Sequence, residues 1–107
     1  MRAYRKSTHQ KLEISEISPE HFIIKGDLTF ATLDKKALEH CKFIDSAKNI
    51  SIDLQYLGKT DSAGLALVLE WLKTSKINGT KLHLENIPHQ LQSLAKLSGF
   101  EQYLQLL

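Results

Sequence analysis

The chain has few of the residues that form disulfides, tight turns and aromatic stacking surfaces. It contains one cysteine, two prolines and five glycines among 107 residues, with 7% aromatics. The single cysteine, Cys41, excludes an internal disulfide and leaves no second thiolate for a zinc site. No apolar run approaches the roughly 20 residues that cross a bilayer, and the N-terminus lacks the apolar centre of a signal peptide. We therefore expect a cytoplasmic protein that reaches a membrane only through a partner.

Charged residues of one sign are not clustered along the chain either. The formal net charge is +2, and no dense basic stripe interleaved with aromatics is present, which argues against nucleic-acid binding. The N-terminus is mildly basic, and we expect a solvated tail there, with weak attraction to anionic lipid as the alternative. The basic residues concerned are Arg2, Arg5, Lys6 and Lys11.

No constellation of catalytic residues can be found. The five histidines are scattered without a metal-ligand spacing, Ser62 has no Gly-x-Ser-x-Gly elbow, and Gly26 stands outside any phosphate-binding glycine loop. Asp27 and Asp61 could approach each other at a loop edge, and solvated caps are the interpretation we favour. The sequence predicts no enzyme activity, no cofactor and no metal. The histidines are His9, His21, His40, His83 and His89.

Hydrophobic periodicity predicts an α/β fold in the order ββαβαβα. An initial hairpin and later strands alternating with helices favour a largely parallel, mixed sheet with helices on one face. We expect a single domain over residues 1–107 with its core at about 11–104. The expected elements are strands at 11–17 and 22–24, a helix capped by Thr32, a strand at 49–54, a helix at 61–75, a strand at 81–85, a helix from Pro88 to Ser98, and an apolar tail at 103–107.

Residues 60–72 are the most informative segment. An apolar strand leads through a polar loop to Thr60, Asp61 and Ser62, and an apolar helix follows at once. Free backbone N–H groups and the helix dipole favour negative charge at such a position. A hydroxyl there can cap the helix, receive a phosphate, or mark a docking surface. Capping is the commonest role, and Asp61 would repel a phosphate on Ser62.

The helix that follows carries apolar residues on two sides. At 100° per residue, one side should pack on the sheet: Leu65, Val68, Leu69, Leu72 and the stem of Lys76. Roughly opposite lie Ala63, Leu67, Trp71 and Thr74, flanked by Glu70 and Lys73. Either the third helix or the tail covers this second side, or it is an exposed anchor patch for a partner.

Three segments resemble the STAS domain shared by anti-sigma factor antagonists and sulfate transporters: Lys25–Thr32, Ile50–Leu54 and Thr60–Leu67. The resemblance extends from about Lys11 to Leu104 and implies a sheet with helices on one face. In the antagonists, a phosphorylatable serine lies in a motif like Asp-Ser-Ser-Gly-Leu-Gly. Ser62 matches that serine, whereas Ala63 and Ala66 replace the second serine and the later glycine.

The segments Asp61–Leu69 and Leu94–Leu97 are closer to the small STAS subunit of Mla phospholipid transporters. That resemblance implies a non-catalytic cytoplasmic subunit, peripheral to the inner membrane, which binds the ATPase of an ABC transporter that maintains outer-membrane lipid asymmetry. A phospho-switch acting through Ser62 is the alternative. The implied docking residues, with Leu67 and Trp71 as apolar anchors, are Thr60, Asp61, Ser62, Ala63, Leu67, Glu70, Trp71 and Thr74.

Overall fold

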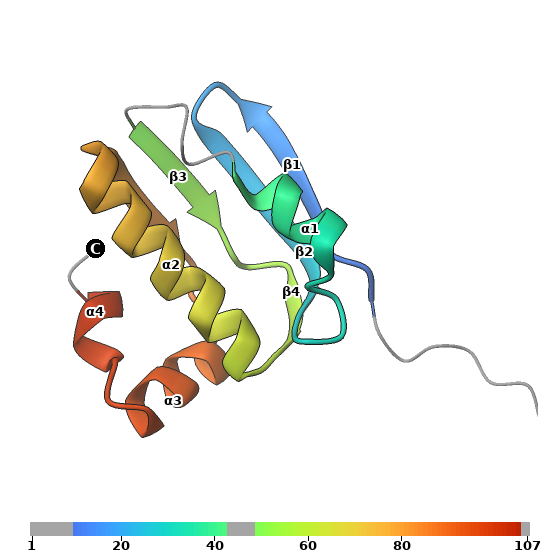
Figure 1. Ribbon diagram of the computed structural model, residues 1–107, viewed down its shortest axis with the longest axis vertical. Helices are drawn as coiled ribbons and strands as arrows, with labels where there is room; N and C mark the ends of the chain where they lie inside the picture. Colours follow the sequence, from blue (N-terminus) through green and yellow to red (C-terminus); the bar gives the residue numbers. More distant parts are fainter. Residues whose placement is uncertain (1–9, 43–48, 106–107) are drawn as a thin grey trace, which may run out of the picture.

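The computed structural model describes residues 10–42 and 49–105. Expectations for Arg2, Arg5, Lys6, Leu106 and Leu107 therefore lie outside the described residues. The elements are β1 (Glu13–Ser18), β2 (His21–Leu28), α1 (Lys35–His40), β3 (Asn49–Asp53), β4 (Leu57–Thr60), α2 (Ser62–Asn78), β5 (Lys81–Glu85), α3 (His89–Leu97) and α4 (Glu101–Gln105). Figure 1 shows their arrangement.

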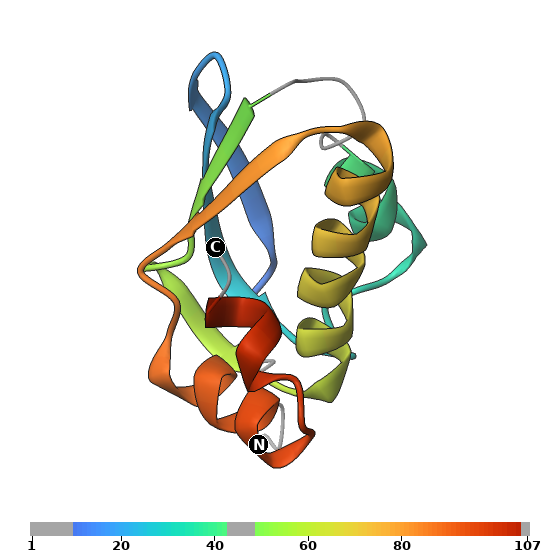
Figure 2. The ribbon, with the colours of Figure 1, turned by 90° about the vertical axis from the view of Figure 1, so that its left-hand side faces the viewer.

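The strands form one mixed sheet, as the sequence predicts. The order is β1-β2-β3-β5, with β4 paired to β2. β1 and β2 are antiparallel, and the β2–β3 and β3–β5 pairs are parallel. The helices α1 and α2 lie on the same side of the sheet, and α3 and α4 gather at one end of the molecule (Figure 2). His83 lies on the edge strand β5 and is exposed.

The strand β4 was not predicted from the sequence, where residues 55–62 read as a loop. β2 uses its first half to pair with β3 and its second half to pair with β4, through Gly26–Leu57 and Leu28–Thr60. The strand expected at 22–24 is therefore too short, because β2 continues through Gly26 to Leu28. Gly26 has a φ of +91° and packs on the backbone of Lys11, where a Cβ would overlap the carbonyl oxygen. Glycine permits this contact without ending the strand.

The N-cap of helix α1 lies two residues later than predicted. Asp34, rather than Thr32, is the N-cap, and its carboxylate accepts a hydrogen bond from Ala37 N at 2.8 Å. The Thr32 hydroxyl instead donates to the carbonyl oxygen of Asp27 at 2.7 Å. A threonine hydroxyl bonds nearby backbone as readily in a loop as at a cap, so sequence pattern alone did not separate the two.

Trp71 lies inside the protein, which contradicts its prediction as an exposed anchor. Its side chain is 3% exposed, and its indole N–H donates to the carbonyl oxygen of Cys41 at 3.3 Å. At this hydrogen bond the C-terminal end of α1 contacts Trp71. The elements considered from the sequence as a cover for this side of α2 were only the third helix and the tail. The buried residues of α2 are Gly64, Leu65, Val68, Trp71 and Ser75. Leu69 and Leu72, expected against the sheet, are only half-buried.

In the C-terminal half of the chain, α2 and α3 are each followed closely by a glycine in the left-handed conformation. Gly79 is the left-handed C-cap of α2, with a φ of 70°. Gly99 follows α3 with a φ of 79°, and Phe100 N then donates to the carbonyl oxygen of Ala95 at 2.7 Å, the pattern of a Schellman motif. Within α4, Leu104 is buried, so this part of the predicted tail packs. Ser98, the C-cap of α3, is exposed.

Candidate functional site

The loop between β2 and α1 meets the N-terminus of α2 through one carboxylate. Asp61 Oδ1 accepts hydrogen bonds from Ala63 N at 2.9 Å and Gly64 N at 3.2 Å. Asp61 Oδ2 accepts a third from Phe30 N at 3.0 Å. Asp61 is thus the N-cap of α2, one of the two predicted candidates, and it also ties the two loops together. The loop after β2 and the segment before α2 therefore lie beside each other.

Gly64 fixes how closely α2 approaches the end of β2. A Cβ on Gly64 would overlap the carbonyl oxygen of Leu28. The same carbonyl accepts a bond from Asp61 N at 3.4 Å. The glycine after the Asp-Ser-Ala sequence therefore has a packing role, because only a residue without a Cβ lets the first turn of α2 lie against β2.

Asp27 is buried, which contradicts its interpretation as a solvated cap. Its side chain is 2% exposed. Oδ1 accepts from Lys59 N at 2.8 Å, and Oδ2 accepts from Gln10 N at 3.0 Å. Backbone amides hold the carboxylate in place of solvent, and Asp27 connects β4 to the segment that precedes β1. Its hydrogen bond from Lys59 N holds the chain in place just before Asp61.

The threonines that directly precede Phe30 and Asp61 in the sequence have buried hydroxyls. Thr29 Oγ1 and Thr60 Oγ1 are buried and have no hydrogen-bond partner in the described part of the chain. The backbone of Thr60 is held from the other side, because its N–H donates to Gln90 Oε1 in α3 at 3.2 Å. Thr60, predicted as a partner-binding residue, is 4% exposed and thus lies under the surface rather than on it.

The remaining predicted docking residues keep some exposure. Ser62 and Glu70 are exposed, and four more are half-buried: Asp61, Ala63, Leu67 and Thr74. The structure adds Phe30, which sequence reasoning missed, with 83% of its side chain exposed. Its sequence signal is a large aromatic residue in a short polar loop. The loop and the N-terminus of α2 lie at the same end of the molecule (Figure 1). We call the surface made by Phe30, Asp61, Ser62 and Ala63 the loop-end patch.

The chemistry available around this patch is hydrogen bonding and apolar contact. Within residues 10–42 and 49–105, no three His, Cys, Asp or Glu side chains gather as a metal site. Burial raises the pKa of the Cys41 thiol to about 11, which keeps it protonated and weakly nucleophilic. In the same described ranges, no helix is long and apolar enough to span a membrane.

Comparison with known proteins assigns the fold and the family. The family model described as "Mlab, STAS domain" matches residues 21–107. A solved structure of the anti-sigma factor antagonist SpoIIAA in its unphosphorylated form aligns at a TM-score of 0.62 and 18% identity, covering 86% of this chain and 84% of that one. A sulfate transporter family protein from Wolinella succinogenes aligns at a TM-score of 0.61 and 20% identity, covering 79% and 70% of the two chains.

Proposed function

This chain belongs to the STAS domain family, and from that premise we propose that it is a non-catalytic cytoplasmic subunit of an ABC phospholipid transporter. In this role it binds the transporter's ATPase, stabilises or regulates it, and is held at the inner membrane only through that complex. The transporter would maintain the lipid asymmetry of the outer membrane. The description of the matching family model and the branch-specific residues Ala63 and Ala66 support this choice within the family.

The observation that carries the proposal is the exposed Phe30 on a loop that is held in place. Its backbone N–H is bonded to Asp61, so the ring is presented from a defined position. An exposed aromatic residue with a polar rim is typical of a protein–protein hot spot. Preorganisation lowers the entropy lost on binding. We therefore assign Phe30 the anchor role that the sequence suggested for Trp71.

The proposed docking surface extends from the loop-end patch along one side of α2. Ser62 contributes a hydroxyl at the first turn, and Leu67, Glu70 and Thr74 continue along the helix. Thr60 and Trp71 lie beneath it and position it. The proposed mechanism is a coupling free energy: docking favours the ATPase conformation that dimerises and hydrolyses ATP, without any group of this chain reaching the nucleotide.

A phospho-switch at Ser62 is the second candidate, and the exposure of Ser62 at the first position of α2 favours it. Its electrostatics are poor, however. The Asp61 carboxylate already occupies the N–H groups of Ala63 and Gly64, which are the groups that would otherwise stabilise a phosphate at a helix N-terminus. A phosphoserine beside this carboxylate would be repelled by it.

Co-expression with the ABC ATPase of the same genome tests the proposal. We expect a stoichiometric complex with the wild type, and its loss in Ser62→Arg, because bulk and charge are added at the centre of the loop-end patch. Ile77→Arg is the matched control, since it adds the same side chain at a 73% exposed position near the other end of α2. Absence of a complex with a folded ATPase would overturn the proposal, and phosphate on Ser62 by intact mass would then support the phospho-switch.

A further inference from the structure

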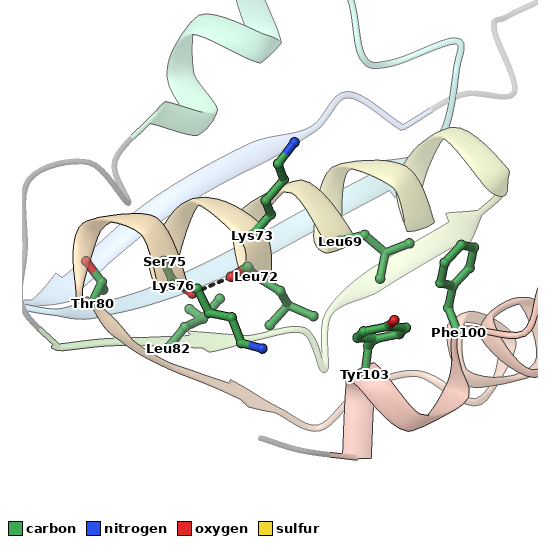
Figure 3. A pocket seen from close by; sticks show the side chains of 9 residues that line it. All are labelled: Leu69, Leu72, Lys73, Ser75, Lys76, Thr80, Leu82, Phe100 and Tyr103. Atoms are coloured by element: carbon green, nitrogen blue, oxygen red, sulfur yellow. Dashed lines mark hydrogen bonds between the residues drawn. The ribbon is translucent and has the colours of Figure 1, made fainter.

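A pocket opens between α2, the start of β5 and α4, on a different part of α2 from the loop-end patch. Its volume is about 420 Å³, within the range of about 300–1,000 Å³ that is typical of small-molecule sites. Figure 3 shows the lining residues: Leu69, Leu72, Lys73, Ser75, Lys76, Thr80, Leu82, Phe100 and Tyr103.

The walls of the pocket are apolar and aromatic. Leu69 and Leu72 are half-buried residues of α2 that pack against the core and also line the pocket, and Leu82 of β5 lines it beside them. On the opposite side, the rings of Phe100 and Tyr103 lie with their centroids 5.8 Å apart. These rings remain 39% and 44% exposed. An apolar molecule entering here would cover leucine and aromatic surface that the fold leaves open to water.

The mouth of the pocket is cationic. In Figure 3 the Lys76 side chain extends toward Tyr103, whereas the ammonium of Lys73 points away from the aromatic pair. The ion pair found among the described residues joins Lys42 to Glu39 of α1. No carboxylate in the described ranges is paired with Lys76. A ligand with one negative charge would meet an available ammonium at the edge of an apolar wall.

We propose that this pocket binds a small anionic amphiphile, a molecule with an unbranched apolar body and a single carboxylate. The apolar body lies against Leu69, Leu72 and Tyr103, and the carboxylate accepts hydrogen bonds from Lys76 Nζ. The charge at one side of an otherwise apolar, ligand-sized pocket favours this occupant over a neutral or cationic one. This inference is independent of the proposed ATPase docking, because none of the docking residues named above lines the pocket.

Dodecanoate, kept below its micelle concentration and titrated into the ¹⁵N-labelled full chain, tests the proposal. We expect saturable amide shifts confined to the pocket residues of α2, β5 and α4. Lys76→Glu should weaken binding by about tenfold or more, since it replaces attraction by repulsion. Lys36→Glu makes the same change on the exposed face of α1 and should leave the affinity unchanged. Both positions are exposed, so both variants are expected to fold.

Two further probes separate this proposal from its rivals. Dodecyltrimethylammonium, with the same chain length and opposite charge, should bind more weakly than dodecanoate. Equal binding of the two, unchanged affinity in Lys76→Glu, or no saturable shifts would overturn the proposal. Binding seen only after removal of Leu106 and Leu107 would also overturn it, because the chain itself would then be the occupant.

Discussion

At the residue scale, the side-chain hydroxyls of Thr32 and Thr60 have opposite hydrogen-bonding environments. Thr32 Oγ1 donates to Asp27 O at 2.7 Å and accepts from Thr29 N at 3.1 Å. Thr60 Oγ1 is buried and has no partner among the described residues. A buried polar group without a partner costs about 1–3 kcal/mol, whereas a satisfied hydrogen bond contributes about 1 kcal/mol. The same change to valine should therefore act in opposite directions at the two positions.

We predict that Thr60→Val raises the free energy of unfolding by about 1 kcal/mol and that Thr32→Val lowers it by about 1–2 kcal/mol. The two variants delete the same hydroxyl, so each is the control for the other. Urea denaturation measured at one pH gives both values. If Thr60→Val destabilises the protein as much as Thr32→Val, the Thr60 hydroxyl has a hydrogen-bond partner in solution and the burial argument fails.

The buried thiol of Cys41 makes stability depend on pH in the alkaline range. Burial raises its pKa from 9.0 to about 11, so between these values the unfolded chain releases this proton and the folded chain keeps it. The free energy of unfolding should fall as the pH rises through this window. Comparing urea midpoints at pH 8 and pH 10.5 for wild type and Cys41→Ala isolates the effect from other titrating groups. Equal losses in both proteins would contradict it.

At the element scale, α2 is held at two points that its hydrophobic pattern did not reveal. Gly64 sits against the carbonyl oxygen of Leu28, and Trp71 is bonded to the end of α1. The start of the helix could be predicted because it is a local property of the sequence, whereas its end was expected at residue 75 and lies at Asn78. Its inner face could be predicted in part, since Leu65 and Val68 are buried as expected. Trp71 and Leu72 are neighbours on a helix that is apolar on two sides, so the pattern alone does not decide which of them is buried.

We predict that Gly64→Ala lowers the free energy of unfolding by about 1–3 kcal/mol, because the added methyl group forces the first turn of α2 away from β2. Alanine would otherwise favour the helix by up to about 1 kcal/mol, so the sign of the effect is diagnostic. Urea denaturation of Gly64→Ala, with the exposed Ser62→Ala variant as a comparison, provides the measurement. A Gly64→Ala variant as stable as wild type would show that the close contact with Leu28 is not required.

The strand β4 shows a second limit of sequence pattern at this scale. Leu57–Thr60 lacks a clear alternation, and it becomes a strand because the second half of β2 is left unpaired by β3. Gly58 helps, since a Cβ there would overlap Asp27 Oδ1. Pairing of this kind depends on register between distant segments, which a single sequence does not state.

At the scale of the whole molecule, α2 connects two surfaces with different chemistry. Its N-terminus carries the loop-end patch with Phe30, and its C-terminal half borders the pocket with Lys76. The order of the first elements and the position of Asp61 at the start of α2 followed from the sequence. The exposed Phe30 and the buried Trp71 did not, because exposure is decided by which elements cover each face. The docking surface is therefore proposed around a residue that only the fold identifies.

The central claim is that the loop-end patch binds the ATPase through Phe30. The most direct test is the dissociation constant of the purified chain for that ATPase, measured for wild type, Phe30→Ser and Ile77→Ser. Phe30 and Ile77 are both largely exposed, at 83% and 73%, so the two variants remove comparable apolar surface from two different places. We predict that Phe30→Ser weakens binding by at least about 30-fold, the size of a hot-spot loss of about 2 kcal/mol, and that Ile77→Ser binds like wild type. Wild-type affinity in Phe30→Ser would contradict the account.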